Sequence, residues 1–299
     1  MTRATLLRPL TLPAATFGAV LGAVLLVLSG CGASNDAAKL TRELLTMPKE
    51  EAYARGEGLV KRKKYQTGRQ YLRFVAENYA NDPIGRQAAL RLADSFFDEK
   101  TQLGYLEAGV RYKDFRNRYP SHPKSDYALF RLAQCSDRQA ERPDREQTNT
   151  RLAATSYREL IINFPDSPYA TESRTRLGVM RNLLAEHEYL VGHFYLKRRA
   201  WRAAKGRMDV ILAAYPEYAG LDKVLYEAGV LERRMGNGGE ARSLWERLQK
   251  DYPASPLVKK VPAPLATAPA LVRAAGGGRL PWQAPAGPRF DVTGFDAVT

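Results

Sequence analysis

Histidine and cysteine are both scarce in this chain. Its 299 residues include three histidines and two cysteines, Cys31 and Cys135. Two cysteines cannot form the disulfide framework that holds many small secreted domains together. The histidines also lack the spacing of a zinc-protease helix, because Val191 stands where a second histidine would have to follow His187-Glu188. We therefore expect neither a metal site nor a cofactor.

Arrangements typical of catalysis are missing as well. No serine or cysteine is placed relative to a histidine in a spacing that indicates a nucleophile and its base. The triple glycine at residues 276–278 follows no predicted strand and precedes no Lys-Ser or Lys-Thr, so it is not a phosphate-binding loop. Cys135 lies in an apolar helical context and is expected to be a small core residue. The sequence therefore favours a protein that is not an enzyme.

Acidic residues are outnumbered by basic ones. The chain has 46 Lys and Arg against 32 Asp and Glu, a formal net charge of +14. This balance favours acidic proteins, anionic lipids or nucleic acid as partners but does not select a fold. The densest basic run, residues 61–64, is interpreted as a solvated helix end that complements the helix dipole. Contact of this run with anionic headgroups is the alternative interpretation.

Only one long apolar run occurs, between residues 10 and 28. A positively charged start precedes it and no basic stop-transfer flank follows it, so residues 1–30 are expected to be an export signal rather than a retained membrane helix. The run ends in Leu-Ser-Gly before Cys31, a sequence that resembles a bacterial lipobox. We expect Cys31 to be lipidated, with several acyl chains anchoring the protein stably. Residues 31–47 would form a tether, and export disfavours nucleic acid as a partner.

The rest of the chain is dominated by the helical period. Between residues 48 and 256, apolar and small residues return every three to four positions. An aromatic residue with a proline close behind it ends each unit, at Tyr79, Tyr119, Phe164, Tyr215 and Tyr252. The steps range from 37 residues (Tyr215 to Tyr252) to 51 (Phe164 to Tyr215), whereas a tetratricopeptide repeat has about 34. The pattern predicts an all-α tetratricopeptide-repeat solenoid of about five helix–turn–helix repeats with lengthened helices or turns.

Small residues recur inside each unit, where two helices are expected to cross closely. Gly68 would take this place in the first repeat, Gly192 in the fourth and Gly229 in the fifth. Trp245 would fill the space beside Gly229.

The composition changes after Pro256. Residues 257–299 contain many prolines and the triple glycine but no helical period. We interpret this segment as a mostly disordered tail.

Four motifs carry a resemblance to a known family. They are the lipobox before Cys31, Asp-Arg-Glu-Gln-Thr at residues 144–148, Leu-Ala-Glu-His-Glu at residues 184–188, and the turn at residues 120–127. Together with five repeats, they resemble the BamD family, tetratricopeptide-repeat lipoproteins of the machinery that assembles β-barrels in bacterial outer membranes. The resemblance covers residues 48–256. Three features depart from the family pattern. Glu146 stands where the family tends to have Asp, and Gly192 stands where Ala is common. The Pro-rich tail is also unusual for the family.

The resemblance implies a non-catalytic scaffold on the periplasmic face of the outer membrane, anchored through lipid. Its C-terminal repeats would dock the last POTRA domain of a BamA-like partner. Its N-terminal repeats would receive the C-terminal segments of unfolded outer membrane proteins, and other Bam lipoproteins are possible partners.

The resemblance also nominates site residues. Arg207 aligns with an arginine that meets acidic POTRA residues, and Arg198, Tyr195 and Glu188 are further candidates in the same repeat. An intramolecular ion pair is the alternative for Arg207. The motif residues Arg145, Gln147 and Thr148 are candidates for partner binding, or they order the long turn of the third repeat through hydrogen bonds to backbone. Tyr53 and Val60 are the candidates for the substrate-peptide groove.

Two other functions remain open from the sequence. A tetratricopeptide lipoprotein of this kind could instead serve type IV pilus secretin assembly, or Tol-Pal and cell-envelope constriction. An adaptor of a different class would use the positive charge to bind cell-wall or lipid polyanions, with binding that weakens steeply as salt rises.

Overall fold

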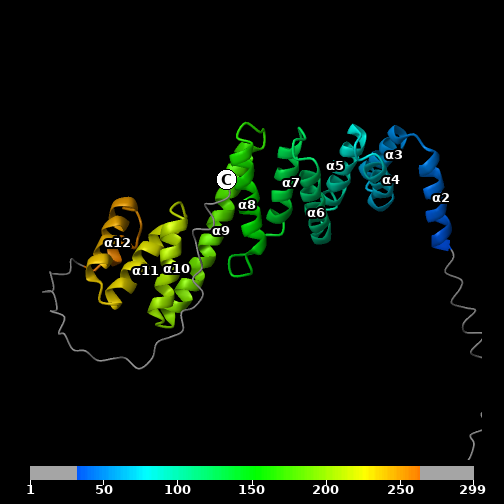
Figure 1. Cartoon of the computed structure of the whole chain (residues 1–299). Helices are drawn as coiled ribbons and strands as arrows, with labels where there is room; N and C mark the ends of the chain where they lie inside the picture. Colours follow the sequence, from blue (N-terminus) through cyan, green and yellow to red (C-terminus); the bar gives the residue numbers. More distant parts are fainter. Residues whose placement is uncertain (1–31, 263–299) are drawn as a thin grey trace, which may run out of the picture.

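The computed structural model of the protein describes residues 32–262, with side chains from residue 39 onward. The expected export signal, Cys31 and the tail after residue 262 lie outside the described residues. Within them the chain forms eleven α-helices and a short 3₁₀ helix, without a strand. The helices follow one another in a row from α2 at one end to α12 at the other (Figure 1). The expected all-α architecture is confirmed.

Ten of these helices pair into five hairpins, as the repeat pattern predicts. The hairpins are α3 (Lys49–Lys61) with α4 (Tyr65–Asn78), α5 (Pro83–Phe97) with α6 (Gln102–Arg118), α7 (Ser125–Asp137) with α8 (Thr148–Asn163), α9 (Ala170–Lys197) with α10 (Trp201–Ala214), and α11 (Leu221–Arg234) with α12 (Gly238–Asp251). Each helix contacts the next one along the chain, so the core runs continuously along the row as in other helical repeat proteins.

The closing aromatics end the second helix of every hairpin. Each of the five is the C-cap residue and leaves the helical conformation, with φ between −121° and −136°, while its N–H still bonds four residues back. A proline follows directly in four of the five repeats. Because proline disfavours the α conformation in the residue before it, the helix stops at the aromatic.

Four of the five hairpins reverse direction through a left-handed residue. Lys63, Lys100 and Arg199 have φ near +60°, and Gly236 has φ of +88°. The exception is the third hairpin, where residues 138–147 form a longer connection between α7 and α8. This loop contains most of the 144–148 motif.

Close helix crossings occur where the small residues predict them. A Cβ added to Gly68 would lie 2.8 Å from Val60 Cγ2, and one added to Gly229 would lie 2.3 Å from Trp245 Nε1. Trp245 therefore fills the space that Gly229 leaves, as expected. Cys135 is buried in the core beside Ala108 and Tyr112, which confirms its expected place.

The segment expected to be a tether is helical. Residues Gly32–Thr46 form α2. Leu44 is buried against the first repeat, and Glu43 pairs with Arg55 at 2.5 Å. The apolar residues near the end of α2 find a partner surface on α3 and α4, which a sequence window alone does not show.

The boundary between repeats and tail also moves. Leu257, Val258 and Val261 pack against the last core cluster, and a 3₁₀ helix covers Val258–Lys260. The folded part therefore continues a few residues past Pro256. The rest of the tail, residues 263–299, lies outside the described part.

Helix α9 is the longest element, with 28 residues. Met180 and Leu184 pack with α8, whereas Ala185 and the residues after it pack with α10 and α11. One continuous helix thus connects two core clusters (Figure 1). Of the helices in residues 32–262, none combines the length and apolar character needed to cross a bilayer.

Candidate partner-binding surface of the third and fourth repeats

The long loop of the third repeat is ordered by the buried amide of Gln147. This side chain is 1% exposed. Its Nε2 donates to the carbonyls of Arg142 (2.8 Å) and Arg145 (3.0 Å), and its Oε1 accepts from the Thr150 hydroxyl (2.8 Å). Gln147 therefore orders the loop through its buried side chain, which is the structural alternative that the sequence left open.

The residues on either side of Gln147 are exposed. Thr148 donates to the carboxylate of Glu146 from its backbone N–H, at 2.8 and 2.9 Å, and from its hydroxyl at 2.6 Å. These hydrogen bonds lower the pKa of Glu146. Arg151, one turn into α8, pairs with the same carboxylate at 3.3 Å. Thr148 thus helps to begin α8, while Arg145 keeps an exposed side chain and contributes its carbonyl to the loop.

This loop is attached to the middle of α9. His187 Nδ1 lies 2.7 Å from the carbonyl oxygen of Pro143. A carbonyl can only accept, so Nδ1 carries the proton and donates. The contact joins residues 44 positions apart and places the loop beside the residue that follows His187, the candidate Glu188.

Glu188 and Arg207 form an ion pair between α9 and α10. Arg207 Nη1 lies 2.8 Å from Glu188 Oε2, and the two side chains are 43% and 17% exposed. Gly192 allows the two helices to approach here, since an added Cβ would meet Arg207 Cβ at 3.1 Å. The intramolecular pair considered for Arg207 therefore exists, but it leaves the guanidinium half exposed.

Tyr215 and Arg181 complete this surface. Burial raises the pKa of Tyr215, and the negative charge of Glu188 raises it further, while Arg181 and Arg151 act in the opposite direction. Arg181 stacks over the Tyr215 ring at 5.3 Å and pairs with Glu217, whose pKa this hydrogen bond lowers. Charged groups of α8 and α9 therefore surround one tyrosine.

The structure separates the other candidates of the fourth repeat from this surface. Arg198 caps the end of α9 and stacks over Phe194 at 5.0 Å. Tyr195 is partly buried against the core of the last two repeats. Arg198 is ten residues beyond Glu188, which corresponds to roughly 15 Å along a helix. These two residues belong to the far end of α9.

The two groove candidates of the first repeat have different environments. Tyr53 is partly buried between two core clusters, and burial raises its pKa. Val60 is 3% exposed and packs with Leu72 and Leu92. Val60 is therefore a core residue, and its expected place in a peptide groove is corrected. Its apolar character is explained by the close crossing with Gly68.

Sequence reasoning missed Arg151 and Arg181 as members of the charged surface. Both lie on helices with a regular helical pattern, and nothing in their local sequence distinguishes them from other exposed arginines. His187, which the sequence analysis considered only for a metal site, is half-buried and bonds the loop at Pro143.

A first prediction separates the structural from the exposed residues of this loop. Replacing Gln147 with alanine removes the donor for two carbonyls and the acceptor for a buried hydroxyl, so we expect the free energy of unfolding to fall by about 2 kcal/mol. Arg145→Ala changes only an exposed side chain and should stay within about 0.5 kcal/mol of the parent. Urea unfolding followed by circular dichroism measures both. Equal effects of the two substitutions would contradict the assignment.

Comparisons with known proteins agree with this architecture. A family model described as outer membrane lipoprotein, YfiO, matches residues 45–225, and a tetratricopeptide repeat model matches residues 223–255. The chain is similar to a protein named outer membrane protein assembly factor BamD from Haemophilus influenzae, 27% identical over 177 residues, which are 56% of this chain and 66% of that protein, just under two thirds.

Relatives with the same printed name extend the match over more of the chain. The protein from Caulobacter vibrioides is 25% identical over 233 residues, 78% of this chain and 75% of that protein. The protein from Neisseria meningitidis serogroup A is 24% identical over 243 residues, 78% of this chain and 90% of that protein. The YfiO match covers more than half of the 299 residues. The chain therefore belongs to the YfiO family of outer membrane lipoproteins, the family of the BamD assembly factors.

Proposed function

We propose that this chain is an assembly factor for outer membrane β-barrel proteins and acts as a non-catalytic scaffold. Membership of the YfiO family carries the proposal, because the curated relatives are named outer membrane protein assembly factors. An extended row of helices suits this role, since it offers a long surface for other chains. Lipidation of Cys31 would hold this surface at the periplasmic face of the outer membrane.

The charged surface of the third and fourth repeats is the proposed docking site for the last POTRA domain of a BamA-like partner. Arg207 has five N–H donors, and its contact with Glu188 uses one of them. The Glu188 carboxylate fixes the position of the guanidinium while 43% of the side chain stays exposed. A carboxylate of a partner can bind the remaining donors, because arginine forms bidentate pairs with carboxylates.

The exposed members of the loop extend this docking site. The bond from His187 to Pro143 fixes the loop on α9, next to Glu188. Arg145 follows Pro143 by two residues and is exposed, so it is the loop residue that we include in the docking site. In the first repeats, Tyr53 remains the candidate contact for unfolded outer membrane proteins.

A charge reversal tests the docking site. We expect the chain from residue 32 onward to bind the POTRA domains of the same organism's BamA, and Arg207→Glu to weaken this binding by roughly tenfold or more. The substitution places two carboxylates together and repels an acidic partner. Binding is measured by titration calorimetry, with circular dichroism to show that the variant is folded. Arg202→Glu, an exposed arginine on another face of α10, provides the same change of charge as a control.

The possible results test the BamA partnership and the role of Arg207 separately. Equal loss with both substitutions would indicate a general effect of charge, and unchanged binding of Arg207→Glu would place the interface elsewhere. No binding to folded POTRA domains would contradict the BamA partnership. Co-purification with a secretin or with Tol-Pal components would then support the alternative scaffolds.

A further inference from the structure

Helix α6 exposes a stripe of large apolar side chains. Leu103, Leu106 and Val110 are 68%, 57% and 53% exposed. Their spacing of three and four residues places them on one face of the helix. Isolated exposed leucines are common, but three on one face of one helix form a continuous apolar strip that no described residue covers.

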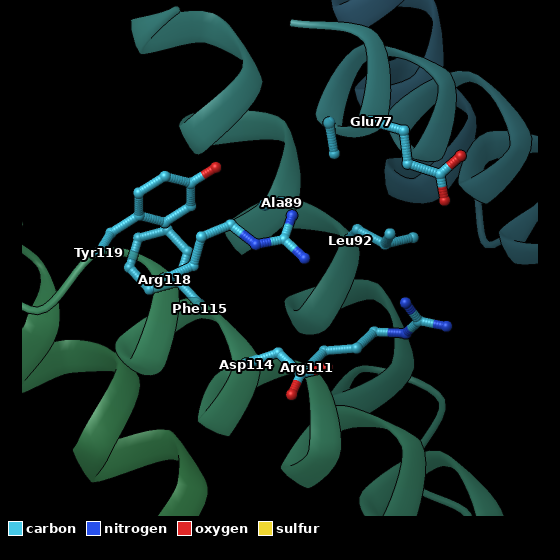
Figure 2. Close-up of a pocket in the computed structure, with 9 residues that line it drawn as sticks. Glu77, Ala89, Leu92, Arg111, Asp114, Phe115, Arg118 and Tyr119 are labelled. Atoms are coloured by element: carbon cyan, nitrogen blue, oxygen red, sulfur yellow. The ribbon is translucent and has the colours of Figure 1, made fainter. Parts of the chain in front are cut away.

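A hollow of about 110 Å³ lies beside this stripe, between α4 and α6 and above α5 (Figure 2). Its apolar lining comes from Ala76, Ala89, Leu92 and Phe115. Its charged lining comes from Glu77 on α4 and from Arg111, Asp114 and Arg118 on α6. In Figure 2 the Arg118 side chain extends across the hollow toward Leu92, and Arg111 extends along its lower edge.

Most of these charged groups have no partner within the chain. Among residues 32–262, Glu77, Asp114 and Arg118 form no ion pair, and all three are exposed. Arg111 pairs with Glu107 at 3.5 Å, but its Nε is buried without a hydrogen-bond partner. The part of Arg111 that a ligand in the hollow can reach is therefore the rest of its guanidinium.

The stripe and the hollow form one surface. An α-helix turns about 100° per residue, so Asp114 and Arg118 lie on the face of α6 next to that of Leu103, Leu106 and Val110. From Leu103 to Arg118 the surface is roughly 22 Å long. An extended segment of about seven residues spans this distance.

We propose that this face of α6 is a docking site for an amphipathic segment of a protein partner. The segment places apolar side chains on Leu103, Leu106 and Val110, and it places an aspartate or glutamate in the hollow, where the Arg118 and Arg111 side chains lie. Arginine suits this task because its planar donors match a carboxylate. The site lies on the second repeat and is independent of the surface proposed above for the third and fourth.

The distribution of charge favours a peptide over an anionic membrane. Glu77 and Asp114 stand among the arginines of the hollow, so the four lining charges balance. A bilayer of anionic headgroups needs a continuous basic surface, and a hollow with as many carboxylates as arginines does not provide one. A peptide brings one carboxylate to the arginines, and its N–H groups or a basic side chain can meet Glu77 and Asp114.

Synthetic peptides test the proposal on the chain from residue 32 onward. The probes are fluorescent peptides of about twelve residues, long enough to exceed the surface. Each peptide has leucines at alternate positions near one end and an aspartate near the other. Two versions are made, one with the leucines at the N-terminal end and one with them at the C-terminal end. A twin of each has lysine in place of aspartate, and binding is followed by fluorescence polarisation.

We expect the parent to bind an aspartate peptide more tightly than its lysine twin. Arg118→Glu should lower the affinity for the aspartate peptide roughly tenfold, because it replaces attraction with repulsion. The same substitution should raise the affinity for the lysine twin. Leu106→Glu should weaken both. Lys113→Glu makes the same change of charge on the other side of the stripe and should leave both affinities near those of the parent.

Several results would overturn the proposal. The carboxylate site would be contradicted if the parent bound both twins equally. It would also be contradicted if Arg118→Glu and Lys113→Glu had equal effects on binding. Binding to vesicles of phosphatidylglycerol that Leu106→Glu abolishes, without peptide binding, would assign the face to a membrane. A dimer in sedimentation that Leu106→Glu dissociates would assign it to a second copy of this chain.

Discussion

The variant Gly85→Ala is expected to lose about 3 kcal/mol of its free energy of unfolding, the upper part of the range for overpacking. Gly85 lies in the first turn of α5, which folds back tightly on the end of α4. A Cβ added here would lie 1.8 Å from the carbonyl oxygen of Tyr79 and 2.4 Å from its carbonyl carbon. Both atoms are backbone, so no rotation of a side chain can make room. The turn between the first two repeats has to open instead.

The turn beside Gly85 is also part of a larger set of contacts. The Asp82 carboxylate accepts from the N–H of Ile84 at 2.9 Å and pairs with Lys49 at 2.5 Å. The Tyr119 hydroxyl of the next repeat donates to the carbonyl of Ala80 at 3.0 Å. A displaced turn would weaken these contacts together. For this reason we expect the effect of the substitution to extend to the second repeat.

Gly58→Ala is the matched control for this prediction. Gly58 lies in the last turn of α3, and a Cβ added there meets no atom within 4 Å. The same change of residue should stabilise the chain by about 0.5–1 kcal/mol, because alanine loses less backbone freedom than glycine on forming a helix. Thermal and urea unfolding of both variants measure the two changes in the free energy of unfolding. A Gly85→Ala variant as stable as the parent would show that the turn is looser than described.

The substitution Arg176→Met is expected to cost about 2 kcal/mol, less than the roughly 3–5 kcal/mol for breaking a fully buried ion pair, because the Arg176 side chain is 37% exposed. Arg176 of α9 donates from Nε to Asp137 of α7 at 2.7 Å, and its Nη2 bonds the second carboxylate oxygen. The hydroxyl of buried Tyr157, on α8, donates to the same carboxylate at 2.8 Å. Asp137 has a side chain that is 9% exposed. Methionine keeps the aliphatic contacts of Arg176 but leaves this carboxylate without its cation.

A double substitution distinguishes the lost charge pair from lost packing. With Asp137→Asn added, no buried charge remains and the amide oxygen can still accept from Tyr157, so the double variant should be more stable than Arg176→Met alone. This is the non-additivity expected of residues in contact. Arg174→Met, at an exposed position two residues away, should stay within about 0.5 kcal/mol of the parent. Additive effects of the two substitutions in a urea series would contradict the pairing.

These contacts also concern function, because they join the third repeat to α9. The proposed docking site depends on the position of α9 relative to the loop of the third repeat, through His187 and Pro143. Loss of the Arg176–Asp137 pair removes a contact that holds α9 against α7 and α8. We therefore expect Arg176→Met to weaken partner binding indirectly, through the placement of this helix.

The sequence predicts the repeats well because their signals are local. Five aromatic residues with prolines close behind them mark the ends of five second helices, and the structure has each of them as a C-cap. A helix end depends on the conformation of two or three consecutive residues, so a short window contains the information. The close crossings at Gly68 and Gly229 follow from the same logic, since a small residue at helical spacing indicates a close neighbour.

The sequence is less informative about which surface each apolar residue meets. Val60 has the character of a groove residue, but the crossing with Gly68 covers it. The segment expected to be a tether is helical, and its Leu44 packs on the first repeat. In both cases the deciding neighbour is supplied by another helix, and helical periodicity does not identify it.

The sequence by itself determined that this protein is an all-α chain of five hairpins, that Cys135 lies in the core and that it resembles the BamD family, because these depend on short periodic patterns and motifs. Only the tertiary structure decided that Gln147 is buried, that Pro143 meets His187 and that Glu188 pairs with Arg207. The same holds for the hollow beside α6. These contacts depend on the positions of whole helices relative to one another, and those positions result from side-chain packing along the full row of repeats.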